Sequence, residues 1–171
     1  MKRAGIRPRT ILILIGIFIL IFAIYLVLSI LLKEKAPAYD FTGTAADGSH
    51  ITLSDNYTKC GTAVLFYDTA TPRAVDTVKQ LEKAAKKFKT VDFITVSVDE
   101  GTLEEQVAKS KEAGLTPFDH SLYDMDGKLA KLYNISATPC LYFIDKDGIV
   151  QDAYLGIISD DSLQSELENI A

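Results

Sequence analysis

The feature that most constrains this chain is an uncharged, strongly apolar segment near its N-terminus. From Ile11 to Leu32 there are 22 residues without a charge, nearly all of them Ile, Leu, Val, Phe or Ala. A helix of this length rises about 33 Å, which is enough to cross the hydrocarbon core of a bilayer. We therefore predict four parts: an N-terminus at 1–10, a transmembrane anchor at 11–32, a linker at 33–38 and one domain at 39–171.

The charges beside this segment predict its orientation. Lys2, Arg3, Arg7 and Arg9 precede it, whereas the mixed stretch Lys33-Glu34-Lys35 follows it. By the positive-inside rule the N-terminus is cytoplasmic, so we expect a single-pass protein of the cell membrane with its domain outside the cytoplasm. A cleaved signal peptide is the alternative, because Ala36-Pro37-Ala38 has the A-x-A form. The apolar segment is longer than the usual ~7–15 residues, which favours the retained anchor.

Charge and composition exclude several functions for the rest of the chain. Residues 36–171 hold 12 basic and 22 acidic residues, a net charge of −10, which argues against binding to nucleic acid. The chain has only two cysteines and two histidines, so a disulfide framework and a Cys/His zinc site are excluded. His50 and His120 have no partner at ligand spacing, and we expect both at the surface. No residue pattern predicts a metal or another cofactor.

Hydrophobic periodicity and turn dipeptides predict an α/β domain. Its expected elements, in chain order, are a hairpin of Tyr39–Thr44 and His50–Leu53, a strand at Thr62–Tyr67, a helix carrying Val75, Val78, Leu81, Ala85 and Phe88, a strand at Val91–Val98, a helix at Leu103–Ala113 ended by Gly114, a short helix at Lys128–Tyr133, a hairpin of Cys140–Asp145 and Ile149–Leu155, and a last helix capped by Ser159 or Asp160. This order predicts a mixed central sheet with helices on both faces and an N-terminal β-hairpin.

Several of these segments resemble one family of proteins. Residues 36–42 (APAYDFT) and 51–55 (ITLSD) look like the opening of membrane-anchored TlpA/ResA-like proteins of the AhpC/TSA (redoxin) superfamily. Ala137-Thr138-Pro139 and the following residues 141–148 resemble that family's cis-proline segment and closing hairpin. The resemblance covers the chain from Ala36 to its C-terminus. It implies a thioredoxin-like fold, a cis Pro139 beside the active-site loop, and thiol-disulfide oxidoreductases as relatives.

The family's catalytic motif, Trp-Cys-x-x-Cys, has no counterpart here. The resemblance places Thr71 at the nucleophilic cysteine and Ala74 at the resolving cysteine, with Pro72 and Arg73 between them. A peroxiredoxin pattern, Thr-Pro-x-Cys, also puts Ala74 at the reactive position. The chemistry needs a thiolate, which neither threonine nor alanine can supply. We therefore predict a vestigial active-site loop that cannot run the family's dithiol cycle.

The two cysteines of the chain do not replace the missing pair. Cys140 follows Pro139, whereas Cys60 precedes the strand at 62–67 and should lie at its opposite end. Six extended residues span about 20 Å, and bridged cysteines have Cα atoms under about 7 Å apart, so a disulfide between them is not expected. Cys140 then has two interpretations: a small buried residue that opens a strand, or a single redox thiol that forms mixed disulfides.

Polar residues surround the vestigial loop. Asp68, Thr69, Thr71 and Arg73 lie where the chain leaves the strand and enters a helix. A helix N-terminus can bind an anion, but we expect the threonines chiefly to cap the helix. Two functions remain for the domain. The first is binding, without catalysis, of a protein or peptide partner of the cell envelope beside Pro139; the alternative is an oxidoreductase or antioxidant redoxin that acts through Cys140 alone.

Overall fold

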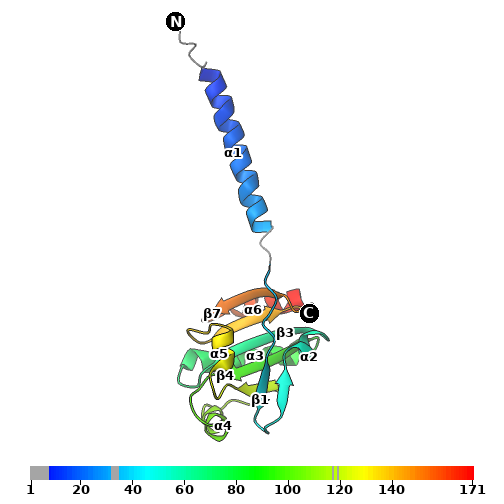
Figure 1. Ribbon diagram of the computed structural model, residues 1–171, viewed down its shortest axis with the longest axis vertical. Coiled ribbons are helices and arrows are strands. Elements are labelled where there is room, and N and C mark those ends of the chain that lie inside the picture. Colours follow the sequence, from blue (N-terminus) through cyan, green and yellow to red (C-terminus); the bar gives the residue numbers. More distant parts are fainter. Residues whose placement is uncertain (1–7, 32–34, 117, 119) are drawn as a thin grey trace. The chain divides into compact units, whose positions relative to one another are not determined.

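The computed structural model describes residues 8–31, 35–116, 118 and 120–171 of the chain, and it divides into two compact units, Met1–Lys35 and Ala36–Ala171. The first unit contains helix α1, Pro8–Leu31, whose side chains are described from Ile15 to Leu26 (Figure 1). Among the described residues, no helix has both the length and the apolar character needed to cross a membrane. The membrane anchor therefore stays a prediction.

The second unit is built on one mixed β-sheet. Its described residues form seven strands in the order β2-β1-β5-β4-β3-β6-β7. These are β1 Thr42–Ala45, β2 His50–Thr52, β3 Gly61–Tyr67, β4 Val91–Ser97, β5 His120–Tyr123, β6 Cys140–Ile144 and β7 Val150–Leu155. The strands β3, β4 and β5 are mutually parallel, and the remaining pairs are antiparallel. The predicted mixed sheet and N-terminal hairpin are confirmed, but the sequence reasoning missed β5, which joins that hairpin to β4.

Helices cover both faces of this sheet, as expected (Figure 1). They are α2 Ser54–Tyr57, α3 Pro72–Lys87, α4 Leu103–Glu112, α5 Lys128–Leu132 and α6 Asp160–Ile170. The helix α3 begins with Pro72 in its first turn, where the missing N–H costs no hydrogen bond. The helix α4 begins with a capping box of Thr102 and Glu105, and Gly114 follows it at a φ of 69°. The short helix α2 was not predicted.

Alternate residues of the central strand β3 face two separate apolar clusters. Ala63, Leu65 and Tyr67 pack with the buried faces of α3 and α6. Val64 and Phe66 point to the other side, where Leu129 of α5 and the following Tyr133 belong to the second cluster. Every residue of β3 is buried, as a strand covered on both faces requires. Both clusters lie wholly within residues 36–171, so this unit encloses its own hydrophobic core and can fold as a separate domain.

The strand β7 forms one edge of the sheet and, within the described residues, pairs with β6 alone. The segment at residues 36–38 lies against the start of this edge. Pro37 forms an isolated β-bridge with Ile149, and the N–H of Ala38 donates a 2.8 Å hydrogen bond to the carbonyl of Gly148. These residues of the expected linker are therefore held against the domain.

Candidate binding site at the cis-proline loop

The candidate site lies at one end of the sheet, where three chain segments meet. The parallel strands β3 and β4 end there at Tyr67 and Ser97, and β6 begins there at Cys140. The peptide bond between Thr138 and Pro139 is cis, as the resemblance implied. Carboxyl ends of parallel strands are the usual position of sites in α/β sheets. The loops that follow Tyr67 and Ser97 and the loop before Cys140 therefore form one cluster.

The carboxylate of Asp68 connects two of these loops. Its Oδ1 accepts a 2.8 Å hydrogen bond from the N–H of Thr71, and its Oδ2 accepts a 2.9 Å bond from the Thr71 hydroxyl. The same Oδ2 accepts a further hydrogen bond from the hydroxyl of Thr138. Asp68 therefore fixes the turn that leads into α3 and holds it against the cis-proline loop. The sequence placed Asp68 in a polar rim but did not predict this central role.

Thr71 does not cap α3 in the way that the sequence predicted. It occupies the N-cap position with an extended backbone, but its side chain makes no cap hydrogen bond. Its hydroxyl donates to Asp68 instead, and only its carbonyl accepts from the N–H groups of Ala74 and Val75. The expectation of a threonine cap was wrong for Thr71, because a charged acceptor in the preceding loop forms the stronger hydrogen bond.

A second carboxylate, which the sequence reasoning missed, holds the other half of the loop. Asp99 follows β4 and is 8% exposed. Its Oδ1 accepts bonds from the N–H and the hydroxyl of Thr69, at 3.1 and 2.9 Å, and its Oδ2 accepts a 3.0 Å bond from the hydroxyl of Ser97. The threonine at 69 therefore anchors the loop to β4 rather than capping a helix. Only an acidic residue directly after a buried strand could have indicated this anchor.

The four residues of the predicted vestigial loop have different surroundings. Pro72 and Arg73 are exposed, Thr71 is half-buried, and Ala74 is fully buried in the cluster beneath α3. Within the described part of the chain, Arg73 has no ion-pair partner. The loop therefore presents a hydroxyl already bound to Asp68, a guanidinium and a methyl group inside the core. None of these groups can carry out thiol-disulfide exchange, which requires a thiolate.

Cys140 lies close to this loop in the fold but faces the other side of the sheet. It pairs with Phe66 in the antiparallel register of β3 and β6, and both residues belong to the cluster on the α5 face. Ala74 belongs to the opposite cluster. Cys140 is 8% exposed, and burial raises the pKa of its thiol above the ordinary value. The interpretation of Cys140 as a small buried strand residue is therefore the one that its surroundings favour.

Cys60 lies far from the loop along β3. It precedes Gly61, at the opposite end of the strand from Phe66, and it is partly exposed. Both cysteines are free, as predicted. Burial, together with the negative charge of Asp92, raises the pKa of the Cys60 thiol. This end of the sheet therefore supplies no activated thiol to the candidate site.

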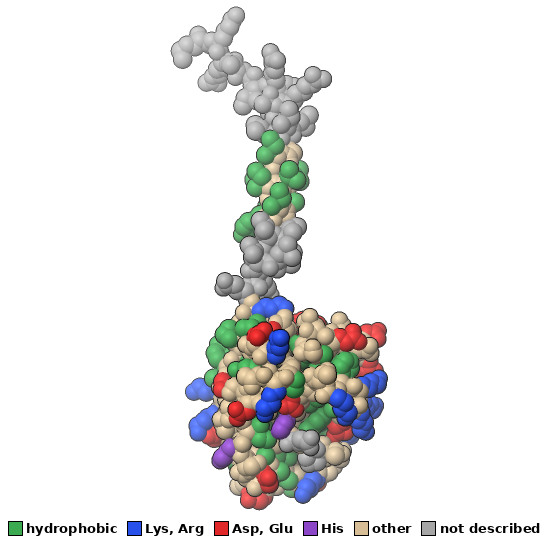
Figure 2. All heavy atoms as spheres, turned by 90° about the vertical axis from the view of Figure 1, so that its right-hand side faces the viewer, with side chains coloured by type: hydrophobic (Ala, Val, Ile, Leu, Met, Phe, Trp, Pro, Cys, Tyr) green, Lys and Arg blue, Asp and Glu red, His purple; other side chains and the backbone are tan. Residues whose placement is uncertain are grey.

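The histidines do not form a site either. The prediction of a surface position was wrong for His120, which is half-buried and lies 3.4 Å from a carboxylate oxygen of Asp92. His50 is exposed on the edge strand β2. In the ranges that the structure describes, no group of three or more His, Cys, Asp and Glu side chains is arranged to hold a metal ion. Figure 2 shows acidic and basic side chains interspersed over one face of the domain.

The surface beside the cis-proline loop is open and partly apolar. Leu155 and Ile157 are 66% and 63% exposed, and they flank Gly156, whose N–H donates a 2.8 Å bond to the carbonyl of Pro139. A shallow groove lined in part by Arg73 and Ile157 begins here. Among the described residues, neither the N–H nor the carbonyl of Thr138 has a hydrogen-bond partner. Apolar contacts and free backbone groups therefore occur side by side.

Comparisons with known proteins agree with this architecture. The AhpC/TSA family matches residues 33–153, and the chain belongs to this family. No curated protein matches the chain significantly.

Three solved structures illustrate the fold. A thiol:disulfide interchange protein of Chlorobium tepidum TLS is 19% identical, with 80% of this chain and 97% of that chain covered and a TM-score of 0.66. The exposed lipoprotein thioredoxin Etrx1 of Streptococcus pneumoniae is 24% identical, with 77% of this chain and 99% of that chain covered and a TM-score of 0.64. The thioredoxin domain of a thiol-disulfide oxidoreductase of Bacteroides vulgatus is 19% identical, with 82% of this chain and 99% of that chain covered and a TM-score of 0.68. At these identities the likeness establishes a thioredoxin-like fold.

Proposed function

We propose that residues 36–171 form a thioredoxin-like module that binds an extended segment of a protein of the cell envelope beside Pro139, without catalysis. Residues 11–32 tether this module to the membrane, with the domain on the extracytoplasmic side. One observation carries the proposal: the loop between β3 and α3 holds no sulfur and is closed by the hydrogen bonds of Asp68 to Thr71 and Thr138. The loop that the resemblance aligns with the family's catalytic motif is here part of the binding surface.

The chemistry of the loop supports the absence of catalysis. A threonine hydroxyl stays protonated near neutral pH, and the hydroxyl of Thr71 is already committed to Asp68. Ala74 has no reactive atom and is fully buried. Thiol-disulfide exchange proceeds through a mixed disulfide, so a loop without sulfur cannot take part in its first step.

The backbone at the cis-proline supports binding. An extended peptide adds to a protein by hydrogen bonds to free N–H and C=O groups, with adjacent pockets selecting its side chains. Thr138 has both backbone groups free among the described residues, and the exposed Leu155 and Ile157 lie on either side of Gly156, which is hydrogen-bonded to Pro139. A partner segment can therefore gain backbone hydrogen bonds and apolar contacts at the same place.

The alternative, thiol chemistry through Cys140 alone, has less support. A working thiol has to reach its substrate and has to ionise near neutral pH. Cys140 is 8% exposed, faces the cluster on the α5 side, and has a pKa that burial raises. Each of these features opposes the reactivity that the alternative requires.

The test combines a binding selection with an activity assay on the purified domain of residues 36–171. Peptides displayed on phage are selected on the domain, and we expect enriched sequences whose binding is lost in Ile157→Asp. Met125→Asp is the matched control, because Met125 is also exposed, at 44%, but lies in the loop after β5. We expect no reduction of insulin disulfides with dithiothreitol as the electron donor. Insulin turnover at the rate of an ordinary thioredoxin, or enriched peptides indifferent to Ile157→Asp, would contradict the proposal.

A further inference from the structure

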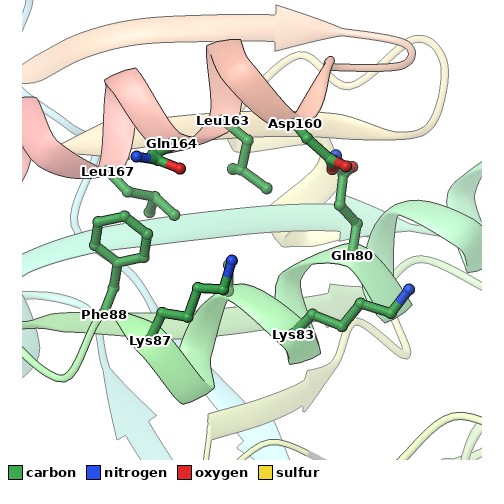
Figure 3. A pocket seen from close by; sticks show the side chains of 9 residues that line it. Gln80, Lys83, Lys87, Phe88, Asp160, Leu163, Gln164 and Leu167 are labelled. Carbon is green, nitrogen blue, oxygen red and sulfur yellow. The ribbon is translucent and has the colours of Figure 1, made fainter.

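A second candidate surface lies away from the cis-proline loop, between α3 and α6. A groove of about 180 Å³ lies there. Figure 3 shows that side chains of the two helices face each other in it. Lys83 and Lys87 project from α3 at one rim, and Gln164 projects from α6 at the other. The apolar residues that line the groove between these rims are Ala84, Phe88, Leu163 and Leu167.

The α3 rim is positively charged in a domain whose net charge is −10. Five lysines occur between residues 79 and 89, at positions 79, 83, 86, 87 and 89. Lys83 and Lys87, four residues apart on one side of the helix, are both exposed. The described part of the chain contains two ion pairs, His120–Asp92 and Lys128–Asp126, and neither lies at this rim. The two ammonium groups are therefore not neutralised within the domain.

The α6 rim has the opposite charge. Asp161 and Glu168 are exposed and lie seven residues apart, so they share one side of the helix. Gln164 lies between them and donates a 2.9 Å hydrogen bond to Glu168. Because Gln164 lines the groove and Asp161 and Glu168 lie three and four residues from it along α6, these acidic side chains border the groove on its α6 side. Lys83 and Lys87 border it on the α3 side. At the end of the groove near Asp160, the amide of Gln80 donates a hydrogen bond to that carboxylate and joins the two helices.

A surface of this kind is complementary to itself. In a two-fold dimer the same patch meets its own copy. In a patch with one basic and one acidic rim, each rim can then face the rim of opposite charge on the other copy. We propose that this face binds a second copy of the chain, with α3 of each copy against α6 of the other. Lys83 and Lys87 of one copy then face Asp161 and Glu168 of the other, and the apolar linings of the two grooves meet between them.

Other partners would be attracted to only one of the two rims. An acidic peptide would contact Lys83 and Lys87 but would be repelled by Asp161 and Glu168. An anionic membrane would meet the same opposition, together with the net charge of −10 on the domain. A second copy also carries a net charge of −10, but it is the partner for which both rims contribute attraction at contact.

The first experiment measures self-association of the wild-type domain, residues 36–171, by sedimentation equilibrium from micromolar to millimolar concentration. We expect a monomer–dimer equilibrium that weakens as sodium chloride is raised, because the Debye length falls from about 8 Å at 0.15 M to about 3 Å at 1 M salt. A domain that stays monomeric throughout this range, or a dimer unaffected by salt, overturns the proposal without the use of any variant.

Charge reversal then identifies the surface. We expect Lys83→Glu/Lys87→Glu, which makes both rims acidic, and Asp161→Lys/Glu168→Lys, which makes both rims basic, each to weaken dimerisation by at least about tenfold. An equimolar mixture of the two variants should form a heterodimer. The acidic α3 of the first variant then meets the basic α6 of the second, and the acidic α6 of the first meets the basic α3 of the second. Both variants keep a net negative charge, so general attraction between them does not explain a heterodimer.

A matched control separates the surface from overall charge. Lys131→Glu/Lys146→Glu makes the same change in net charge at two exposed lysines, one in α5 on the opposite face and one in the β6–β7 turn. We expect this variant to dimerise like the wild type at raised salt, where the change in net charge is screened. The proposal is overturned if the control loses as much dimerisation affinity as Lys83→Glu/Lys87→Glu. It is also overturned if the two complementary variants fail to associate.

Discussion

The carboxylate of Asp68 accepts a hydrogen bond from the hydroxyl of Thr138, which lies 70 residues further along the chain. This bond joins the loop after β3 to the residue that precedes the cis-proline. In the proposed binding mode these two loops flank the position of the partner segment. The same carboxylate also binds the N–H and the hydroxyl of Thr71, so one side chain sets the geometry of both loops.

Replacement of this carboxylate by an amide tests that role. Asp68→Asn keeps one oxygen acceptor but loses the other, so either the Thr71 N–H or the two hydroxyls lose their partner. We expect the free energy of unfolding to fall by about 1–2 kcal/mol, measured by urea denaturation. Asp126→Asn, at an exposed carboxylate paired with Lys128, should change it by much less. Equal effects in the two variants would show that Asp68 holds nothing together.

Restoring two cysteines tests whether the scaffold still supports the family's reaction. In Thr71→Cys/Ala74→Cys the first sulfur replaces the half-buried hydroxyl side chain and the second enters the fully buried position of Ala74. We expect measurable insulin reduction from the double variant, and none from Thr71→Cys alone, because the resolving thiol is then absent. Complete inactivity of a folded double variant would mean that the loop differs in geometry as well as in sequence.

The burial of Cys140 leads to a prediction about its reactivity. In a Cys60→Ala background, a thiol reagent should modify Cys140 slowly in the native domain and rapidly after unfolding, since burial both shields the sulfur and raises its pKa. Cys140→Ala should lower the free energy of unfolding by about 1 kcal/mol and leave peptide binding unchanged. Fast native labelling, with a specific mixed disulfide trapped in the envelope, would lead us to abandon the binding-module proposal.

The buried hydroxyl of Tyr67 predicts how stability changes at alkaline pH. Tyr67 is 3% exposed, and burial raises its pKa to about 12 from the ordinary value of 10.0. Folding favours the protonated form of Tyr67. The resulting contribution to the free energy of unfolding is therefore complete below about pH 10 and is lost as the pH rises through about 12.

Two variants measure this contribution. We expect the unfolding free energy of Tyr67→Phe to decline less than that of the wild type over this range, by on the order of 2–3 kcal/mol. At neutral pH the same variant should lose about 1 kcal/mol, because Ser110 loses its 3.1 Å hydrogen bond. Tyr39→Phe, at a residue 62% exposed, should follow the wild type, and an alkaline decline identical in all three proteins would refute the assignment.

The expected membrane topology can be tested on intact cells. The uncharged segment 11–32 and the basic residues before it predict an anchor with the domain outside the cytoplasm. Protease added to spheroplasts should remove the domain, and alkaline carbonate should leave the full chain in the membrane fraction. Recovery of a soluble protein that begins near Tyr39 would favour the cleaved signal peptide instead.

Most of the fold could be predicted because its elements carry local signals. The strand β3 contains the uninterrupted apolar segment 63–67, α3 has an apolar stripe with helical spacing, and turn dipeptides lie within the hairpins. The strand β5 lacked such a signal, since its four residues, HSLY, begin with two polar side chains. Its pairing with β4 and β1, which are distant in sequence, makes it a strand.

The candidate site was only partly predictable for a related reason. The positions of Thr71, Ala74 and Pro139 followed from a resemblance that preserves the order of segments. The roles of Asp68 and Asp99 depend on contacts with residues 70 and 30 positions away, which no local pattern encodes. The hydroxyl of Thr71 fits a capping motif in sequence, and only the neighbouring carboxylate directs it elsewhere.

The contact between residues 36–38 and the edge strand β7 has a consequence for proteolytic maturation. The tripeptide Ala36-Pro37-Ala38 has the form of a signal peptidase motif. Its Ala36 carbonyl accepts a 3.0 Å hydrogen bond from the N–H of Val150, the first residue of β7, and Pro37 bridges the preceding Ile149. Cleavage after Ala38 would remove these contacts and open the outer edge at the start of β7, which would then pair with β6 alone. Exposed strand edges recruit other chains into intermolecular sheets. Retention of these three residues in the uncleaved chain therefore protects the domain from edge-to-edge aggregation.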